Sequence, residues 1–265
     1  MKKVVVTGST RGIGFGLAEA FLAQGCHVII SGRRDDAVQE AVSALRQSLV
    51  NSDVAGFPCD VRDEHQVQTL WDQACASMGQ VDIWVNNAGI SGMQGKIWEL
   101  PYDHLRAVIE TNILGAILGS QVAARGMLAQ GTGEIYNMLG LGSDGRMRPG
   151  LVTYGMSKAA LAYFTRGLVQ EAENTPLIIG SLQPGMVITD MIMDQYQDRP
   201  EDLERVRRIF SIIASRVEDV APWLVARILS NTKSGVKISY SSSLKIAWRF
   251  MSAPFIRRDP FGEGD

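Results

Sequence analysis

Short runs of β-branched and other apolar residues alternate with longer stretches of helical periodicity through most of this chain. Each short run is almost continuously apolar, a pattern typical of parallel strands in a sheet covered on both faces. Alternating strands and helices build right-handed β-α-β units, so we expect a doubly wound α/β fold with helices on both faces. The expected strands are Lys3–Thr7, His27–Ser31, Asp53–Pro58, Val81–Val85, Glu134–Met138, Leu177–Leu182 and Val236–Tyr240. The expected helices are Gly12–Gln24, Asp35–Ser48, Glu64–Met78, Tyr102–Gln130 and Thr153–Glu173.

No linker, repeat or low-complexity segment divides the sequence, so we expect a single domain over residues 1–265. That length is enough for one α/β domain with a sizeable core. Residues 198–230 are predicted to form two helices, and helices within 186–215 are expected to lie on the substrate side. Residues 241–265 form an atypical tail of aromatic, apolar and basic residues.

Charge and residue content argue against several classes of function. The net charge is −2, which disfavours nucleic acid as a main partner. The three cysteines show no C-x-x-C spacing and indicate reduced thiols, and the three scattered histidines suggest no metal site. We find no signal peptide and no apolar run near the ~20 residues of a membrane span, so we expect a cytoplasmic or organelle-soluble protein.

A glycine-rich turn stands where the first predicted strand meets the first predicted helix. Glycines let the backbone turn tightly and approach a pyrophosphate, and the helix N-terminus adds unbonded N–H groups and partial positive charge. The spacing is G-x-x-x-G-x-G rather than G-x-G-x-x-G, but its strand–turn–helix context favours a dinucleotide site over a purely structural turn. The residues of this turn expected to bind the cofactor are Gly8, Ser9, Thr10, Arg11, Gly12, Ile13 and Gly14.

The end of the second predicted strand bears on the choice between NAD and NADP. An acidic residue there holds a ribose 2′-hydroxyl, whereas arginine accommodates a 2′-phosphate. This strand runs into Arg33 and Arg34, and Arg11 adds a guanidinium from the glycine turn. Guanidinium groups bind phosphate through forked hydrogen bonds, so we predict NADP. The alternative is that Arg33 and Arg34 are solvated loop charges.

Two further strand ends are expected to contact the cofactor, because ligands of an open parallel sheet bind beyond the carboxyl ends of its strands. Asp60, after the third strand, could accept the adenine amino group or cap a helix beginning near Arg62. After the fourth strand comes Asn-Asn-Ala-Gly, whose small residues let a cofactor pass close to the backbone, although alone it reads as a turn. The cofactor-binding residues expected at these two ends are Asp60, Val61, Asn87, Ala88 and Gly89.

Tyr154 and Lys158 stand four residues apart near the start of a predicted helix, so they share one face of it. A free tyrosine has a pKa of ~10, and a neighbouring ammonium favours the phenolate and lowers that value. Tyr154 would then be the general acid that protonates a carbonyl oxygen during reduction. The alternative is an ordinary Tyr–Lys pair on a solvated helix face, where such pairs are common. The pair follows the fifth predicted strand, in register with the glycine turn, and this position favours catalysis.

Four motifs occur in order and at fitting spacings: TGSTRGIG, NNAG, YGMSK and PGMVIT. With them, the sequence resembles the short-chain dehydrogenase/reductase family over roughly its first 230 residues. The resemblance implies a Rossmann-like sheet of seven strands, a nicotinamide cofactor, and hydride transfer to or from a carbonyl or alcohol. It also implies a homodimer or homotetramer.

The resemblance implies roles for individual residues. Lys158 would also hold the nicotinamide ribose, and Asn112 would support a proton relay through water; alone, Asn112 reads as an ordinary polar residue of a helix. After the sixth strand, Val187 backbone groups would meet the carboxamide and Thr189 would support the phosphate side. The cofactor-binding residues implied in this last motif are Pro184, Gly185, Val187 and Thr189.

One part of the family's site is replaced in this sequence. Most members carry hydroxyls two and three residues after the asparagine that ends the fifth strand. Here that asparagine is Asn137, and the two places hold Leu139 and Gly140. The next hydroxyl belongs to Ser143, in a glycine-rich loop that permits an unusual path toward the site. We predict that Ser143 donates to the developing oxyanion; the alternative is a turn serine beside Asp144.

The altered loop is similar to that of one branch of the family, the chlorophyll(ide) b reductases. The shared strings here are NMLGLGS, YGMSK and PGMVIT. That branch reduces a formyl group on the chlorin ring to a hydroxymethyl group with NADPH, which implies a large apolar substrate. An alternative is a generic short-chain reductase of a lipid, steroid or acyl ketone. A non-enzymatic alternative is an NADP-binding regulator with weakened catalysis.

Apolar side chains near the expected substrate side and in the tail suit such a substrate. Methionines within residues 186–193 adapt to irregular surfaces, although they would also serve as helix core. The tail is expected to pack on the domain; a pocket lid and peripheral membrane contact are the alternatives. Its apolar members are Trp248, Phe250, Met251, Phe255 and Ile256, and its cations include Arg249, Arg257 and Arg258.

Overall fold

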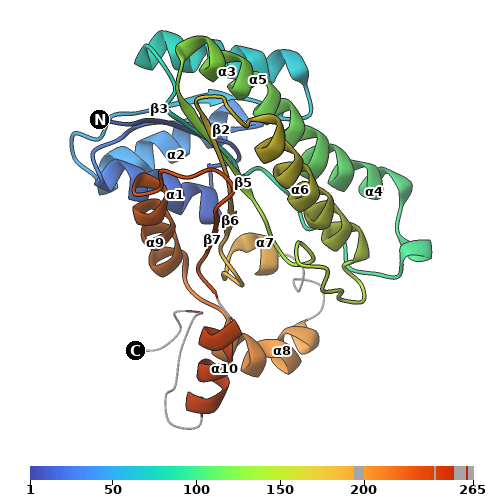
Figure 1. Ribbon diagram of the computed structural model, residues 1–265. Helices are drawn as coiled ribbons and strands as arrows, with labels where there is room; N and C mark the ends of the chain where they lie inside the picture. The colour runs from blue at the N-terminus through green and yellow to red at the C-terminus, as the bar shows by residue number, and fades with distance from the viewer. Residues whose placement is uncertain (194–199, 242, 254–260, 262–265) are drawn as a thin grey trace.

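The computed structural model describes residues 1–193, 200–241, 243–253 and 261 of the chain. They are built around one parallel sheet in the order β3-β2-β1-β4-β5-β6-β7 (Figure 1). The doubly wound fold with a seven-stranded parallel sheet, predicted from the sequence, is confirmed. The strands are β1 Lys3–Val6, β2 His27–Gly32, β3 Val54–Pro58, β4 Ile83–Asn86, β5 Gly133–Met138, β6 Leu177–Gln183 and β7 Lys237–Ser239.

Side chains alternate in direction along each strand, so both faces of this sheet need cover. Val4 and Val6 point into one core, and Val5 between them points into the other. Val5 pairs in register with Ile29 and Trp84, which belong to the same second core. All five side chains are fully buried, which explains why the strands read as continuous apolar runs.

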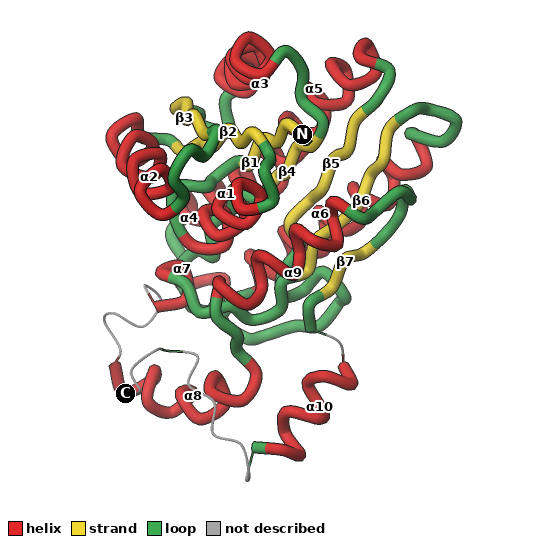
Figure 2. The backbone as a smooth tube through the Cα atoms, turned by 90° about the vertical axis from the view of Figure 1, so that its left-hand side faces the viewer, coloured by secondary structure: helices red, strands yellow, loops and turns green. Residues whose placement is uncertain are grey.

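Helices cover the two faces in separate layers: α1 and α9 lie to the left of the sheet in Figure 1 and α6 lies to its right, and Figure 2 looks onto the left-hand layer. One layer consists of α1 Gly12–Ala23, α2 Asp35–Ser48 and α9 Val217–Leu229. The other consists of α3 Glu64–Met78, α5 Gly115–Gln130 and α6 Val152–Glu171. Gly16 lets α1 and α9 approach closely, because a methyl group there would lie 2.2 Å from Val217 Cγ1.

The predicted helix from Tyr102 to Gln130 is confirmed with the same bounds. It contains one feature that was not predicted: α4 Tyr102–Ile109 continues through a π-helical turn over Glu110–Leu114 into α5. By length and mean hydropathy alone this stretch could cross a membrane. In the fold, α5 packs on β4 and β5, and α4 packs on α6.

Three helices lie beyond the carboxyl ends of the strands. They are α7 Asp190–Met193, α8 Pro200–Ile213 and α10 Ser243–Ser252. α7 and α8 lie within residues 186–215, where substrate-side helices are expected, and α8 packs on α10 at the lower end of Figure 1. The tail therefore contains a helix, on which Trp248, Phe250 and Met251 are exposed. The tail residues Phe255, Ile256, Arg257 and Arg258 lie outside the described residues.

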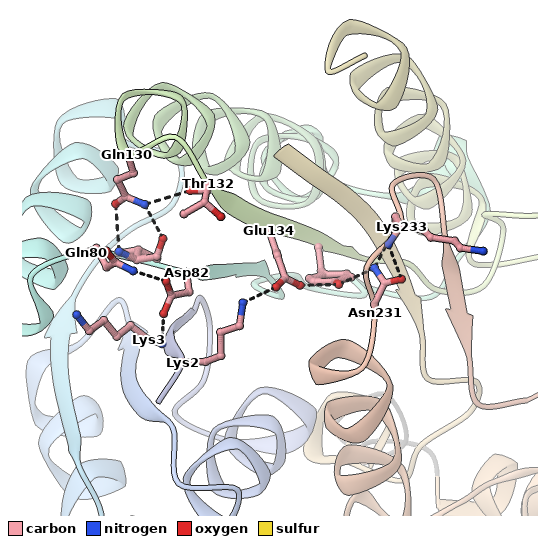
Figure 3. Close-up of polar contacts among 11 residues, drawn as sticks. Lys2, Lys3, Gln80, Asp82, Gln130, Thr132, Glu134, Asn231 and Lys233 are labelled. Carbon is pink, nitrogen blue, oxygen red and sulfur yellow. Dashed lines mark hydrogen bonds and ion pairs between the residues drawn. The ribbon is translucent and has the colours of Figure 1, made fainter. Parts of the chain in front are cut away.

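Side chains from distant segments meet toward the amino edge of the sheet (Figure 3). Lys2 Nζ donates to Glu134 Oε1 at 2.8 Å. The Tyr136 hydroxyl donates to Glu134 Oε2 at 3.0 Å and accepts from Asn231 Nδ2 at 2.9 Å. These bonds tie the start of β1 to β5 and to the turn between α9 and β7.

Candidate active site

The glycine-rich turn lies beside the point where the strand order reverses, between β1 and β4. Gly8 and Gly12 have φ angles of 61° and 59°, a region that side chains disfavour. A methyl group on Gly8 would lie 2.7 Å from Cα of Ala88. Asn87 Nδ2 donates to the carbonyls of Thr7 and Gly8, at 2.9 Å each. The structure thus brings the NNAG motif directly onto the glycine turn.

The groups at this turn fit a nucleotide pyrophosphate. Helix α1 begins at Gly12 without a side-chain cap, and its first turn carries no acidic residue. Its first N–H groups therefore remain available to an anion, on a backbone that glycines leave uncovered. Beside them, Asn87 Oδ1 is a buried oxygen without a hydrogen-bond partner among the described residues.

Other residues of the turn mainly shape it. The fully buried Ser9 turns its hydroxyl inward, where Oγ donates to the carbonyl of Val6 and accepts from the N–H of Ser31. Ile13 packs against the core under α1, and Asn87 Nδ2 would lie 2.4 Å from a methyl group on Gly14. These positions support the backbone that would face the cofactor.

The arginines expected near a 2′-phosphate take different positions. Arg33 and Arg34 are exposed at the end of β2, next to the turn, since Thr10 Cγ2 would lie 2.6 Å from a methyl group on Gly32. Arg34 Nε donates to Asp36 Oδ1 at 3.0 Å. Arg11 pairs instead with Asp190 of α7, at 3.7 Å.

Asp60 is held by Arg62 at the end of β3. Arg62 Nη2 lies 2.5 Å from Asp60 Oδ2. The hydrogen bonds from Arg62 hold the pKa of Asp60 below its ordinary value, and the charge of Arg33 adds to the effect. Asp60 does not cap the next helix, contrary to one alternative, because α3 begins later and Asp63 accepts from its N–H groups. Val61 follows, buried against the domain.

Tyr154 and Lys158 lie in the first turns of α6 and face the end of β5. Lys158 is 4% exposed, and its Nζ donates to the carbonyl of Met138 at 2.9 Å. The same Nζ lies 5.8 Å from the centroid of the Tyr154 ring. A methyl group on Gly140 would lie 2.4 Å from Tyr154 Oη, so the glycine at this place leaves room for the phenol.

Burial sets the ionisation of this pair and corrects the expectation that Lys158 lowers the pKa of Tyr154. Burial raises the pKa of Tyr154 to about 12 and lowers the pKa of Lys158 to about 8. The low-dielectric surroundings disfavour both charged forms, and this effect outweighs the attraction between them. Near neutral pH, Tyr154 is therefore a neutral phenol that can donate a proton.

Asn112 connects three segments around Lys158. It is 1% exposed within the π turn, and its amide bonds the backbone of Ile90 twice: Oδ1 accepts from N at 2.8 Å and Nδ2 donates to O at 2.9 Å. Nδ2 also donates to Ser157 Oγ, which donates to the carbonyl of Tyr154. A methyl group on Gly89 would lie 3.2 Å from Asn112 Oδ1 and 3.5 Å from Lys158 Nζ. The structure thus brings together Asn112, Lys158 and the NNAG motif.

Ser143 lies in the glycine-rich loop after β5, packed on the first turn of α6. A methyl group on Gly142, whose φ is 95°, would lie 2.5 Å from the backbone of Gly155. This contact brings the loop beside the residue that follows Tyr154. Ser143 Oγ donates to Gln183 Oε1 at 3.1 Å, so its partner in the structure is a side chain at the end of β6.

The PGMVIT motif runs from the end of β6 toward the glycine turn. Pro184 and Val187 are buried, whereas Gly185 is exposed with a φ of 81°. Thr189 Cγ2 would lie 3.5 Å from a methyl group on Gly12. Thr189 therefore lies beside the glycine turn.

Three contributors were not foreseen from the sequence: the carbonyl of Met138, the hydroxyl of Ser157 and the amide of Gln183. Ser157 stands inside YGMSK and Gln183 directly precedes Pro184, so their places in motifs gave a usable signal. The Met138 carbonyl gave none, because any residue supplies one.

This fold and this site define a dinucleotide-binding α/β protein with a tyrosine–lysine pair at the carboxyl edge of its sheet. A sequence model of the short chain dehydrogenase family matches residues 2–200. The chain belongs to the short chain dehydrogenase family, and it is an oxidoreductase acting on carbonyl or hydroxyl groups.

Curated proteins are similar to this protein over most of its chain. The chloroplastic chlorophyll(ide) b reductase NOL of Oryza sativa subsp. japonica is 35% identical over 243 residues, 89% of this chain and 69% of the relative. The probable chloroplastic chlorophyll(ide) b reductase NYC1 of Arabidopsis thaliana is 31% identical over 261 residues, 92% of this chain. The chain spans only 51% of that second relative's length. A 3alpha-hydroxysteroid dehydrogenase of Mediterraneibacter gnavus is 31% identical over 72% of this chain and 76% of the relative.

Solved structures share the fold over nearly the whole chain. An actinorhodin polyketide ketoreductase with NADPH superposes with a TM-score of 0.81 at 26% identity, covering 92% of this chain and 97% of that one. A short chain dehydrogenase of Burkholderia cenocepacia in complex with NADP gives 0.77 at 27% identity, covering 90% and 95%. Both carry an NADP-type cofactor, which supports a nicotinamide cofactor for this chain.

Proposed function

We propose that this protein reduces a formyl group on a large apolar substrate of the chlorophyll(ide) b type, with NADPH as the reductant. The observation that carries the proposal is the loop of residues 139–145, which packs on α6 through Gly142 and places Gly140 against the Tyr154 hydroxyl. Residues 139–143 of this loop belong to the string NMLGLGS, in which the sequence resembles the chlorophyll(ide) b reductases. The NOL and NYC1 relatives, which are similar to this protein over most of its chain, support the same reaction.

The glycine turn, the NNAG segment and the PGMVIT motif would hold NADPH. Arg33 is exposed at the end of β2 and, with Arg34, would meet the 2′-phosphate. Asp60 keeps its negative charge beside Arg62 and would accept from the adenine amino group. When bound, NADPH supplies the hydride, and the protein supplies position and the proton.

Tyr154 would donate its proton to the carbonyl oxygen of the substrate as negative charge develops there. Its raised pKa keeps that proton in place near neutral pH. Lys158, with a pKa lowered to about 8, is the nearby cation that stabilises the phenolate left behind. Asn112 holds the Ile90 segment that lines this side of the site.

Ser143 would supply the second hydrogen bond to the developing oxyanion. Its Oγ lies 3.1 Å from Gln183 Oε1. A half-turn of the Gln183 amide would bring Nε2 to this place, so that Gln183 would donate to Ser143 and leave the serine proton for the substrate. Gln183 is in this view a positioning residue, held by the pairing of β6 with β7.

A second candidate is a reductase of a steroid or acyl ketone. Relatives named 3alpha-hydroxysteroid dehydrogenase and putative ketoacyl reductase, 31% and 32% identical over 72% and 73% of this chain, favour it. The proton chemistry of Tyr154 and Lys158 would be the same, so only the substrate distinguishes the two candidates.

The deciding experiment follows NADPH oxidation with a matched panel of carbonyls. The panel contains chlorophyllide b, chlorophyllide a as the control without the formyl group, a 3-ketosteroid and a β-ketoacyl thioester. We expect turnover with chlorophyllide b, a hydroxymethyl product in the absorption spectrum, and none with chlorophyllide a. Activity confined to the ketones would contradict the proposal and favour the second candidate, a reductase of a steroid or acyl ketone.

The cofactor assignment is tested by the same assay with NADH. We expect a strong preference for NADPH that R33A reduces, because a guanidinium no longer faces the 2′-phosphate. Equal turnover with both cofactors in the wild type would refute this role of Arg33. NADPH binding without oxidation of NADPH by any carbonyl would point to a regulator.

A further inference from the structure

The C-terminal helix α10 carries a buried cation. Arg249 is 5% exposed, although the neighbouring Trp248 and Phe250 are exposed. Its Nη1 donates to the carbonyl of Ile213 at 2.7 Å, and its Nη2 donates to Ser215 Oγ at 2.9 Å. Ile213 is the last residue of α8, where a helix presents unbonded carbonyls and partial negative charge. The guanidinium fork therefore joins α10 to the end of α8.

The segment that Arg249 holds is paired with the PGMVIT motif. Ser215 is 1% exposed; its N–H donates to the carbonyl of Met186 at 2.9 Å, and its carbonyl accepts from the N–H of Ile188 at 3.1 Å. Val187 thus forms a parallel bridge with Ser215. Through Ser215, Arg249 is thus linked to the backbone groups on either side of Val187, the residue expected to meet the nicotinamide carboxamide.

The chain just before α10 contacts the same motif independently. Tyr240 donates its N–H to the carbonyl of Gln183 at 3.0 Å. A methyl group on Gly185 would lie 2.3 Å from Ser241 Oγ. Tyr240 and Ser241 therefore contact the start of the motif, and Arg249 contacts its later residues through Ser215.

On these contacts we infer that Arg249 is a positioning residue of the cofactor site. Through Ser215 it fixes the backbone at residues 186–188, so the C-terminal helix is part of the reductase site and not only of the surface. The inference rests on the proposed function, since it concerns the binding of NADPH. A forked donor suits this role because one side chain sets the distance and the angle between two acceptors.

The test compares R249M, R249K and S215A with W248A, which removes an exposed side chain from the same helix. The dissociation constant of NADPH is measured by its fluorescence in the absence of substrate, at a temperature where near-UV circular dichroism shows each variant folded. We expect R249M to raise that constant about tenfold, R249K and S215A to raise it less, and W248A to leave it unchanged. In addition, kcat of R249M at saturating NADPH should be about tenfold below that of the wild type, because the backbone at Val187 is misplaced.

A merely structural role predicts a different pattern. The midpoint of urea unfolding would then fall in the variants while the dissociation constant of the folded protein stayed at the wild-type value, and that result would overturn the inference. If R249M does not fold, R249K and S215A, each of which spares one bond or the charge, decide by the same criterion. Failure of the wild type to bind NADPH at all would instead refute the proposed function.

Discussion

Two tyrosines at opposite edges of the sheet show how one residue type serves structure in one place and chemistry in another. Burial raises the pKa of both Tyr136 and Tyr154. The Tyr136 hydroxyl donates to Glu134 and accepts from Asn231. Among the described residues, none forms a hydrogen bond with the Tyr154 hydroxyl, whose pKa responds to burial alone. Burial raises the pKa of both hydroxyls, although Tyr136 is fully buried and Tyr154 is half-buried by solvent exposure; the hydrogen-bond partners make the difference.

The contrast extends to the cations. Lys2 reaches Glu134, a carboxylate that satisfies it, and the pair is partly exposed. Lys158 is buried and donates to a neutral carbonyl. A charge satisfied by a carboxylate stabilises the fold, whereas a desolvated charge facing neutral groups is available to a substrate or a cofactor. A perturbed pKa therefore identifies the site only when its partners are also considered.

The largest expected effect comes from removing the uncommitted hydroxyl. Y154F should lower kcat for NADPH-dependent reduction about 1,000-fold, because the general acid is lost while the ring that fills the site remains. Y136F is the matched control and should leave kcat unchanged. Steady-state kinetics on the preferred carbonyl measures both. An equal loss in the two variants would break the comparison, since it would mean that both act through the fold.

The next largest effect concerns Lys158, whose charge should make kcat/KM depend on pH. K158M should lower kcat/KM about 100-fold, because no cation then stabilises the phenolate. In the wild type, the pKa near 8 means that kcat/KM for NADPH should fall as the pH rises above about 8, when Lys158 loses its proton. Tyr154, with a pKa of about 12, stays protonated across that range. A profile flat to pH 10 would show that the charge of Lys158 is not used.

The same pKa gives Lys158 an opposite effect on stability. From the ordinary value of 10.5 it falls to about 8, so between these pH values the unfolded chain binds the proton more tightly than the folded one. The free energy of unfolding of the wild type should therefore rise with pH through this window. Relative to wild type, K158M should gain up to about 3 kcal/mol at pH 7 and lose that advantage by pH 10.5. Urea unfolding at several pH values measures the difference.

A smaller effect is expected at Ser143, where the hydroxyl adds one hydrogen bond. S143A should lower kcat about 10-fold to 100-fold, and Q183L should have a lesser effect in the same direction. The KM for NADPH should not change in either variant. Near-wild-type turnover of S143A would remove Ser143 from the site and leave Tyr154 as the sole donor to the oxyanion.

The sequence predicted those parts of the site that depend on local backbone. The strand–turn–helix around Gly8 and the spacing of Tyr154 and Lys158 follow from short-range geometry, so the motifs placed them correctly. The π turn at Asn112 escaped prediction, because it leaves the apolar periodicity of a helix intact. Arg249 escaped for another reason: its burial depends on α8 and Ser215, which only the folded chain brings to it.

The smallest effect on activity should come from Y136F, at the edge of the sheet opposite the site. The same variant should show a clear loss in the free energy of unfolding. Y136F removes the hydroxyl of a fully buried side chain, and with it the hydrogen bonds to Glu134 Oε2 and from the half-buried Asn231 Nδ2. Losing these bonds should lower the free energy of unfolding by about 1–3 kcal/mol, whereas Y154F, which breaks no such bond, should not lower it. Urea unfolding of both variants at pH 7 measures the difference, alongside their turnover. If Y154F were the less stable of the two, its hydroxyl would have a structural partner and the distinction between the two tyrosines would fail.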